Sequence, residues 1–311
     1  MISALLSVIL PTFGVIAIGI FARHIGIWKD NAVEVLNKYA YYIALPALIF
    51  LNVVSMQTSE LLNSQTLIII GLTVAIHFVI IIVTLLIEKI YKVNRETRAA
   101  SPMLMTFGST AYMGIPFVTY LVGGKATAIA SLLSVALVVV MIIVHTMILN
   151  KLDRLPSTQN NFISFLELPF IWAVVLALGW LFLKFPPLPM PIIRFLETLA
   201  GSAGPTALLG IGSFLHCIKP SKVPWTKSIF YSLIKVIVLP LTIFVTMNAL
   251  GLEKTFTVIA VALSAVGTGV TCFVMAEEHK IGTKETAGAI LVSTFLSLIS
   301  LTLISLYYFS T

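Results

Sequence analysis

Charged side chains are scarce: they make up only 10% of the 311 residues, whereas 59% of the residues are hydrophobic. A soluble domain has about a quarter of its residues charged, so this composition excludes a mainly water-facing surface. No polar stretch is long enough to form a soluble domain, and the longest, 151–161, lies at the middle of the chain. A helix that crosses a bilayer needs about 20 apolar residues. The composition therefore predicts an all-α protein that crosses a membrane many times.

Groups that carry catalytic or redox chemistry are also few. The two cysteines, Cys217 and Cys272, lie in or beside apolar runs, so we expect small core residues rather than a disulfide or a metal site. No Asp or Glu lies in the middle of an apolar run, which argues against a paired-carboxylate site for protons or sodium. The sequence also lacks a phosphate-binding loop, a metal-ligand spacing and a nucleophile elbow. These absences argue against ATP-driven transport and against an enzyme, and we expect no cofactor or metal.

Ten apolar runs are long enough to cross the bilayer with some tilt. They cover 4–22, 35–54, 66–87, 99–122, 126–149, 163–183, 192–215, 229–250, 256–276 and 286–309. The first run has no positively charged segment before it and extends to Ala22, so we interpret it as a span rather than a signal peptide. The predicted fold is a polytopic membrane protein with ten transmembrane helices.

The distribution of lysine and arginine predicts the orientation in the membrane. The net charge of +7 could indicate binding to nucleic acid, but these residues lie in short segments between the apolar runs. Thirteen of them lie in the odd-numbered loops and four in or beside the even-numbered loops. Because cytoplasmic loops are enriched in lysine and arginine, we expect a multi-pass protein of the cell (inner) membrane. Both termini would lie outside the cytoplasm, and no nucleic-acid partner is expected.

Matching spacings indicate an internal repeat. The separation in sequence between Pro46 and Gly108 is the same as that between Pro205 and Gly267. Five spans in each half is an odd number, so the two halves would insert in opposite orientations. This inverted plan is typical of secondary transporters, which hold substrate near the midplane at discontinuous helices. The predicted halves are 1–150 and 151–311.

Spans four and nine are predicted to be discontinuous, because small residues and proline cluster in them. Span four contains Gly108, Ser109, Thr110, Gly114 and Pro116, and span nine contains Ser264, Gly267, Thr268, Gly269 and Thr271. Freed backbone groups at membrane depth are tolerated inside protein or beside a water-filled cavity. The N-termini of half-helices then offer N–H groups and a positive dipole to an anion. The alternative is that the small residues only allow close helix packing.

Three segments resemble the auxin efflux carrier family, which includes plant PIN-type carriers and bacterial relatives. They are LNKYAYYIALPALIFLNV (36–53), FGSTAYMGIPFV (107–118) and VTCFVMAEEHKIG (270–282), and the resemblance extends over nearly the whole chain. It implies a scaffold of spans 1, 2, 6 and 7, a transport domain of spans 3–5 and 8–10, an elevator-like movement and a homodimer. The family often has Asn where this chain has Ser109 and Thr271, and Pro where it has Gly267. Auxin is therefore not assumed to be the substrate.

The breaks and the resemblance together predict a secondary transporter that holds a small organic anion where spans four and nine cross. The predicted substrate-binding residues are Pro46, Ser109, Thr110, Tyr112, Pro116, Pro205, Gly267, Thr268 and Thr271. A sodium-coupled symporter of the bile-acid type is the alternative among carriers. A channel is a less favoured alternative, since polar small residues concentrate at two breaks rather than along several helices.

Two ionisable residues lie inside apolar runs, where charge is costly and often functional. His77 follows Pro46 at nearly the same separation in sequence at which Lys235 follows Pro205. We predict a coupling pair that flanks the crossover, with His77 able to titrate near neutral pH. The alternatives are a hydrogen-bonded core histidine and a lysine that extends to the cytoplasmic face. His145 lies near the end of a predicted span, and we expect it at the membrane interface.

Overall fold

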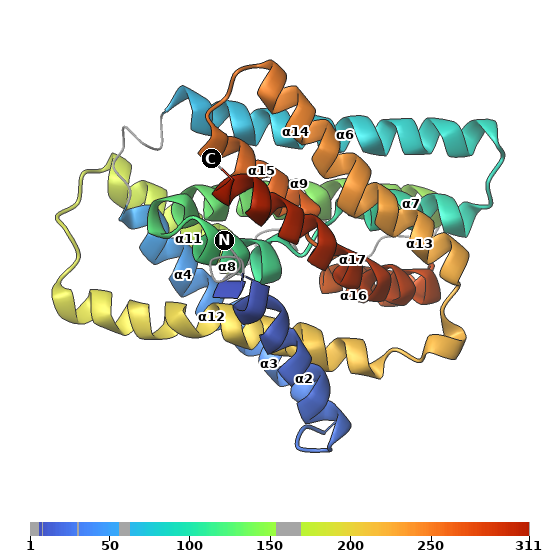
Figure 1. Ribbon diagram of the computed structural model, residues 1–311, viewed down its shortest axis with the longest axis horizontal. Helices are drawn as coiled ribbons and strands as arrows, with labels where there is room; N and C mark the ends of the chain where they lie inside the picture. Colours follow the sequence, from blue (N-terminus) through green and yellow to red (C-terminus); the bar gives the residue numbers. More distant parts are fainter. Residues whose placement is uncertain (1–5, 8, 30, 56–62, 154–168, 311) are drawn as a thin grey trace.

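The computed structural model describes the whole chain except residues 1–5, 8, 30, 56–62, 154–168 and 311. The described residues form helices, short connections and one isolated β-bridge (Figure 1). The first residues of predicted span one and of predicted span six fall outside the described residues. The prediction of an all-α chain is confirmed for the part that the structure describes.

The helices follow the predicted apolar runs, several of them in two or more pieces. The first half contains η1 (Leu10–Gly14), α2 (Val15–His24), α3 (Ala32–Tyr39), η2 (Ala40–Ala44), α4 (Leu45–Val54), α6 (Ser64–Ile90), α7 (Arg95–Thr106), η3 (Thr110–Gly114), α8 (Ile115–Leu121) and α9 (Gly124–Asp153). The second half contains α11 (Pro169–Phe182), α12 (Met190–Cys217), η4 (Pro220–Lys222), α13 (Trp225–Leu233), η5 (Ile234–Val238), α14 (Leu239–Ala249), α15 (Lys254–Ala265), α16 (Val270–Glu278) and α17 (Thr283–Phe309).

Within the described residues, five helices are long and apolar enough to cross a membrane unbroken. They are Ser64–Ile90, Ala126–Leu149, Met190–Cys217, Trp225–Ala249 and Thr283–Phe309, which fall in predicted spans 3, 5, 7, 8 and 10. Shorter apolar helices, Leu10–His24, Ile171–Phe182 and Lys254–Ala265, lie in predicted spans 1, 6 and 9. The chain is thus a multi-pass membrane protein, and the count of ten spans in two inverted repeats remains a prediction.

π-helical turns precede three prolines of the apolar helices. η2, η3 and η5 end two residues before Pro46, Pro116 and Pro240. Proline has no N–H group, and its ring clashes with the carbonyl four residues earlier in a regular α-helix. The wider π turn rearranges the carbonyls ahead of the ring, so the helix bends and continues. The third of these turns contains Lys235.

Two sets of helices can be followed through their contacts, and they meet where α4 packs against α9 and α12 against η3. α12 packs against α2, α3 and α4, and α4 packs against α11. Elsewhere α6 packs on α7, α8 on α9, α13 on α17 and α14 on α15. The first set contains predicted spans 1, 2, 6 and 7, which the family resemblance assigns to a scaffold. The separation into a scaffold and a moving domain remains a prediction.

Glycine brings α2 and α12 into contact backbone to backbone. A Cβ atom at Gly19 would lie 2.5 Å from the carbonyl oxygen of Leu209, and one at Gly212 would overlap the carbonyl oxygen of Ile16. Small residues at such crossings permit close packing of helices in membranes, where lipid offers no hydrophobic drive for association.

The two ends of the helix bundle differ in charge. The connections at 91–94, 218–224 and 279–282 lie at one end, at the right in Figure 1, and those at 183–189 and 250–253 lie at the other. The first three belong to the loops that are rich in lysine and arginine. These lysine- and arginine-rich connections therefore lie together at one end, and the orientation of the bundle in the membrane remains a prediction.

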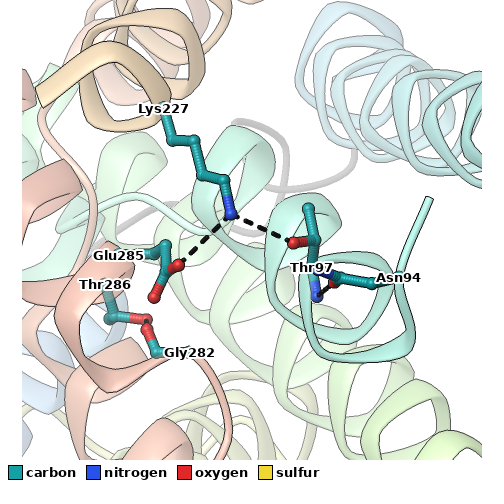
Figure 2. A network of polar contacts seen from close by, with 6 residues as sticks. All are labelled: Asn94, Thr97, Lys227, Gly282, Glu285 and Thr286. Atoms are coloured by element: carbon teal, nitrogen blue, oxygen red, sulfur yellow. Dashed lines mark hydrogen bonds and ion pairs between the residues drawn. The ribbon is translucent and has the colours of Figure 1, made fainter. Parts of the chain in front are cut away.

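Polar contacts at the charged end join three helices (Figure 2). Lys227 of α13 donates to the hydroxyl of Thr97 on α7 and pairs with Glu285 of α17, with both distances 3.4 Å. The side chain of Asn94 caps α7 by accepting from the Thr97 N–H at 2.9 Å. Exposed pairs of this kind each contribute little stability, but together they connect the ends of α7, α13 and α17.

Candidate functional site

Both predicted breaks are present, and the two broken segments pair with each other. α7 ends at Thr106 and helical structure resumes at Thr110, while α15 ends at Ala265 and α16 begins at Val270. An isolated antiparallel bridge joins Gly108 to Thr268. The N–H of Ser109 donates to the Gly267 carbonyl at 2.8 Å, and the N–H of Gly269 donates to the Phe107 carbonyl at 3.0 Å. Two N–H groups and two carbonyls freed by the breaks therefore satisfy one another, as a membrane interior requires.

Glycine is needed where the two extended segments meet. A Cβ atom at Gly267 would lie 2.9 Å from the backbone N and Cα of Thr294 on α17, and one at Gly108 would lie 2.9 Å from Nζ of Lys235. A Cβ atom at Gly269 would lie 3.3 Å from the Gly108 carbonyl oxygen. Any larger residue at Gly267 would push the crossover away from α17.

A cavity of about 30 Å³ lies beside this bridge, and we call it the crossover pocket. Its lining comes from both breaks, from the helices that contain 32–54 and from α9. The lining residues are Tyr41, Leu45, Phe107, Gly108, Ser109, Thr110, Ala111, Tyr112, Val138, Ile142, Gly269, Val270 and Thr271. The volume is enough for one or two water molecules.

The chemistry of the crossover pocket suits an anion. Two helical segments begin at its wall, one at Thr110 and one at Val270. The first N–H groups of a helix have no partner within the helix, and the helix dipole adds partial positive charge there. None of the described residues that line the pocket is acidic. The hydroxyl of Ser109 is buried and has no hydrogen-bond partner among the described residues.

Four of the nine predicted substrate-binding residues line the crossover pocket: Ser109, Thr110, Tyr112 and Thr271. The hydroxyl of Thr110 already accepts a hydrogen bond from Ser134 of α9 at 2.9 Å. A role in substrate binding remains a prediction for all four.

The other five predicted residues lie outside the pocket lining: Pro46, Pro116, Pro205, Gly267 and Thr268. Thr268 points away from it, since its hydroxyl donates to the Leu104 carbonyl at 3.1 Å. Pro116 packs against α12, where a Cβ atom at Gly204 would lie 3.3 Å from the proline ring. Pro205 is exposed on α12, which continues through it without a break.

Lys235 is buried inside the protein, with 0% of its surface exposed. Its Nζ atom donates to the carbonyl of Ser264 at 2.5 Å. The alternative of a lysine that extends to the cytoplasmic face is therefore wrong. The π turn and the neighbouring α15 direct this side chain toward the crossover.

His77 is also buried, with 2% of its surface exposed, and its Nδ1 lies 2.7 Å from the carbonyl of Thr73 in the same helix. This geometry agrees with a hydrogen-bonded core histidine. His77 and Lys235 lie near enough to interact electrostatically. Whether they act as a coupling pair remains a prediction.

Two expectations from the sequence are wrong. His145 is not interfacial: it is 1% exposed, its Nε2 lies 3.0 Å from the Thr106 hydroxyl, and its ring stacks on Phe107 with centroids 6.2 Å apart. The packing of α7 on α9 covers it, and distance to a span end does not reveal that packing. Cys217 is exposed because it ends α12, whereas Cys272 is buried as expected.

Nine lining residues of the crossover pocket were not among the predicted substrate-binding residues, and five of them lie in the predicted broken spans: Phe107, Gly108, Ala111, Gly269 and Val270. The other four lie on other helices. Tyr41 and Leu45 come from the segment around Pro46 that carries the family resemblance, which is the one signal that could have found them. Val138 and Ile142 of α9 are apolar residues in an apolar helix, and no sequence signal distinguishes them.

A second, larger cavity of about 340 Å³ lies among η5, α14, α15 and α17. Its lining is apolar apart from Ser300 and the hydroxyl of Tyr307. With no charged side chain among the described residues that line it, this cavity suits hydrocarbon rather than an organic anion.

Comparisons with known proteins identify the family of this chain. The profile of the family described as "Membrane transport protein" matches residues 4–162 and 159–305. An uncharacterized transporter of Methanocaldococcus jannaschii is 25% identical over 307 residues, which cover 96% of this chain and 97% of that protein. A "Putative malonate transporter" of Rhizobium meliloti is 25% identical over 310 residues, which cover 94% of this chain and 92% of that protein. Because the profile covers nearly the whole chain, this protein belongs to the membrane transport protein family, the auxin efflux carrier-like family that its sequence resembles.

Proposed function

We propose that this transporter is a secondary carrier that binds a small organic anion in the crossover pocket and moves it by alternating access. The observation that carries the proposal is the pairing of 107–109 with 267–269, which places two helix N-termini at one cavity. Carriers with discontinuous helices use such N-termini to hold anionic substrate groups. The buried hydroxyl of Ser109, which has no partner among the residues that the structure describes, supplies a further hydrogen-bond donor at the same place.

A carboxylate is the substrate class that fits this chemistry best. Carboxylates accept hydrogen bonds from backbone N–H and hydroxyl groups without needing a cationic partner. The similar protein of Rhizobium meliloti carries the name of a malonate transporter, so we place malonate first among the candidate substrates.

Substrate entry requires the crossover pocket to widen, because about 30 Å³ is too small for a dicarboxylate. One wall of the pocket is made by Tyr41 and Leu45, which belong to the set of helices around α12. The opposite wall is made by the two breaks. Movement of the breaks past this wall, in the manner of an elevator, would open the site to each side in turn. The moving unit of the proposal is spans 3–5 and 8–10, and the scaffold is spans 1, 2, 6 and 7.

The proposal includes a homodimer in the cell membrane, with the lysine-rich end of the bundle in the cytoplasm and both termini outside. The charge asymmetry of the loops supports this orientation. Cysteine accessibility at Lys219→Cys and Lys184→Cys, which lie in connections at opposite ends of the bundle, would test it in intact cells with a membrane-impermeant reagent. The reagent should modify the variant at 184 and spare the variant at 219.

Uptake of labelled malonate and other mono- and dicarboxylates into proteoliposomes tests the transport proposal. Ser109→Leu should fill the crossover pocket and lower uptake at least about tenfold, which corresponds to about 1.4 kcal/mol. Ser300→Leu adds the same side chain in the separate apolar cavity and should leave uptake unchanged. Failure of every carboxylate together with robust flux of cations would reject the proposal. Normal uptake by Ser109→Leu would place the site elsewhere.

A further inference from the structure

The half-helix α15 ends inside the protein, and a lysine occupies that end. The last four carbonyls of a helix have no partner within it, and the dipole places partial negative charge there. α15 ends at Ala265, and the carbonyl of Ser264 accepts a hydrogen bond from Nζ of Lys235 at 2.5 Å. The ammonium group therefore lies against the negative end of a discontinuous helix.

The ammonium group binds a backbone carbonyl and has no acidic partner among the described residues. No carboxylate of the described residues forms an ion pair with Lys235. The hydroxyl of Ser264 is fully buried and has no hydrogen-bond partner among the described residues. That hydroxyl belongs to the residue whose carbonyl Lys235 binds, in the last turn of α15, and an unpartnered buried hydroxyl costs free energy.

The ammonium group lies behind the bridge rather than in the crossover pocket. A Cβ atom at Gly108 would lie 2.9 Å from Nζ of Lys235, whereas the lining of the pocket includes Gly108 and Ser109 but not Lys235. In extended backbone, successive residues face opposite sides. The lysine thus supports the broken segments from one side while a substrate would bind on the other.

In secondary transporters with broken helices, unwound carbonyls and half-helix C-termini are the places where a coupling sodium ion binds. We propose that the Lys235 ammonium group occupies such a cation position, as a cation tethered to the chain, so that transport proceeds without sodium. This inference rests on the proposed carrier function and selects against the sodium-coupled alternative. Removing the lysine side chain frees the Ser264 carbonyl at the end of the half-helix, and a hard cation prefers oxygen ligands.

The test compares wild type with Lys235→Ala in proteoliposomes containing sodium chloride or choline chloride at equal ionic strength. Wild-type uptake should be the same in both salts. Uptake by Lys235→Ala should be low in choline and at least about fivefold higher in sodium, the lower end of typical coupling between two bound ligands. Lys227→Ala removes a lysine from the same span whose partners are Thr97 and Glu285 rather than residues of the crossover, and it should behave as wild type in both salts.

Thermal unfolding of the purified proteins gives a second readout that needs no substrate. Sodium should raise the unfolding midpoint of Lys235→Ala by about 2 °C or more relative to choline, because it binds the folded state. Wild type should show no difference. If Lys235→Ala does not fold, Lys235→Thr takes its place in both measurements, because the threonine hydroxyl supplies one more oxygen ligand.

The outcomes separate the two proposals. Absence of carboxylate uptake by wild type in either salt would reject the carrier function and leave the unfolding measurement interpretable. Sodium stimulation of wild-type uptake, or a Lys235→Ala protein that responds to sodium in neither measurement, would overturn the tethered-cation inference.

Discussion

Two neighbouring positions of the broken spans have different tasks, although both were predicted to bind substrate. Ser109 lines the crossover pocket, and its hydroxyl has no hydrogen-bond partner in the part of the chain that the structure describes. The hydroxyl of Thr268 instead donates to the Leu104 carbonyl of α7. That carbonyl lies in the last turn of α7, where no partner within the helix is available. Thr268 therefore stabilises the crossover itself.

Thr268→Val keeps the shape of the side chain and removes its donor. The free energy of unfolding should fall by about 1–3 kcal/mol, because a buried carbonyl loses its partner. Thr302→Val is the matched control: its hydroxyl bonds the Leu298 carbonyl of its own helix, which the helix backbone already satisfies. Thermal unfolding in detergent measures both variants. Equal midpoints for the two would contradict the assigned role of Thr268.

For single residues, the sequence predicts which residues lie at the breaks better than it predicts whether a side chain is buried. Clusters of Gly, Ser and Thr identified the breaks, and three predicted substrate-binding residues in these clusters, Ser109, Thr110 and Thr271, line the crossover pocket. The burial of Lys235 and His145 was not predictable, since each lies within reach of a span end by residue count. Which way such a side chain points depends on the π turn and on the helices packed around it, and these are tertiary effects.

At the scale of helices, Gly and Pro content predicted where backbone regularity fails but not how. The clusters around Gly108 and Gly267 gave true breaks, in which backbone hydrogen bonds pass to the opposite segment. Pro46, Pro116 and Pro240 instead follow π-helical turns, and Pro205 lies within a continuous α-helix. Proline removes one hydrogen bond in each case, and the packing of neighbouring helices decides whether the chain bulges, breaks or continues.

The crossing of α2 and α12 predicts that the same substitution, Gly to Ala, lowers stability at this crossing and raises it elsewhere. Gly19→Ala should lower the free energy of unfolding by about 1–3 kcal/mol, since its Cβ atom would meet the backbone of α12 and force the helices apart. Gly71→Ala in α6 meets no atom within 4 Å. It should stabilise the protein by about 0.5–1 kcal/mol, the usual preference of a helix for Ala over Gly.

Thermal unfolding of Gly19→Ala and Gly71→Ala in the same detergent measures the difference. If both substitutions shift the midpoint in the same direction, the close approach of α2 and α12 does not contribute as described.

For the whole molecule, the question is whether the two sets of helices move relative to each other. The contact of Pro116 with Gly204 joins α8 of the proposed moving unit to α12 of the proposed scaffold. A Cβ atom at Gly204 would lie 3.3 Å from that of Pro116, and disulfides bridge Cβ atoms about 3.5–4.5 Å apart. Pro116→Cys with Gly204→Cys is therefore suited to a cross-link between the two sets.

A matched pair tests cross-linking within the moving unit. The hydroxyls of Thr119 on α8 and Thr127 on α9 are 3.0 Å apart, so cysteines at these positions should also form a disulfide. Both pairs are made with Cys217→Ser, which removes the exposed native thiol. Oxidation of the 116–204 pair should lower carboxylate uptake at least about tenfold, because conformational change is required for each transport cycle, and reduction should restore it. Oxidation of the 119–127 pair should leave uptake unchanged, since both residues belong to the proposed moving unit and move together.

Full uptake by protein cross-linked between 116 and 204 would show that transport occurs without relative movement at this contact, and an elevator mechanism would then be excluded.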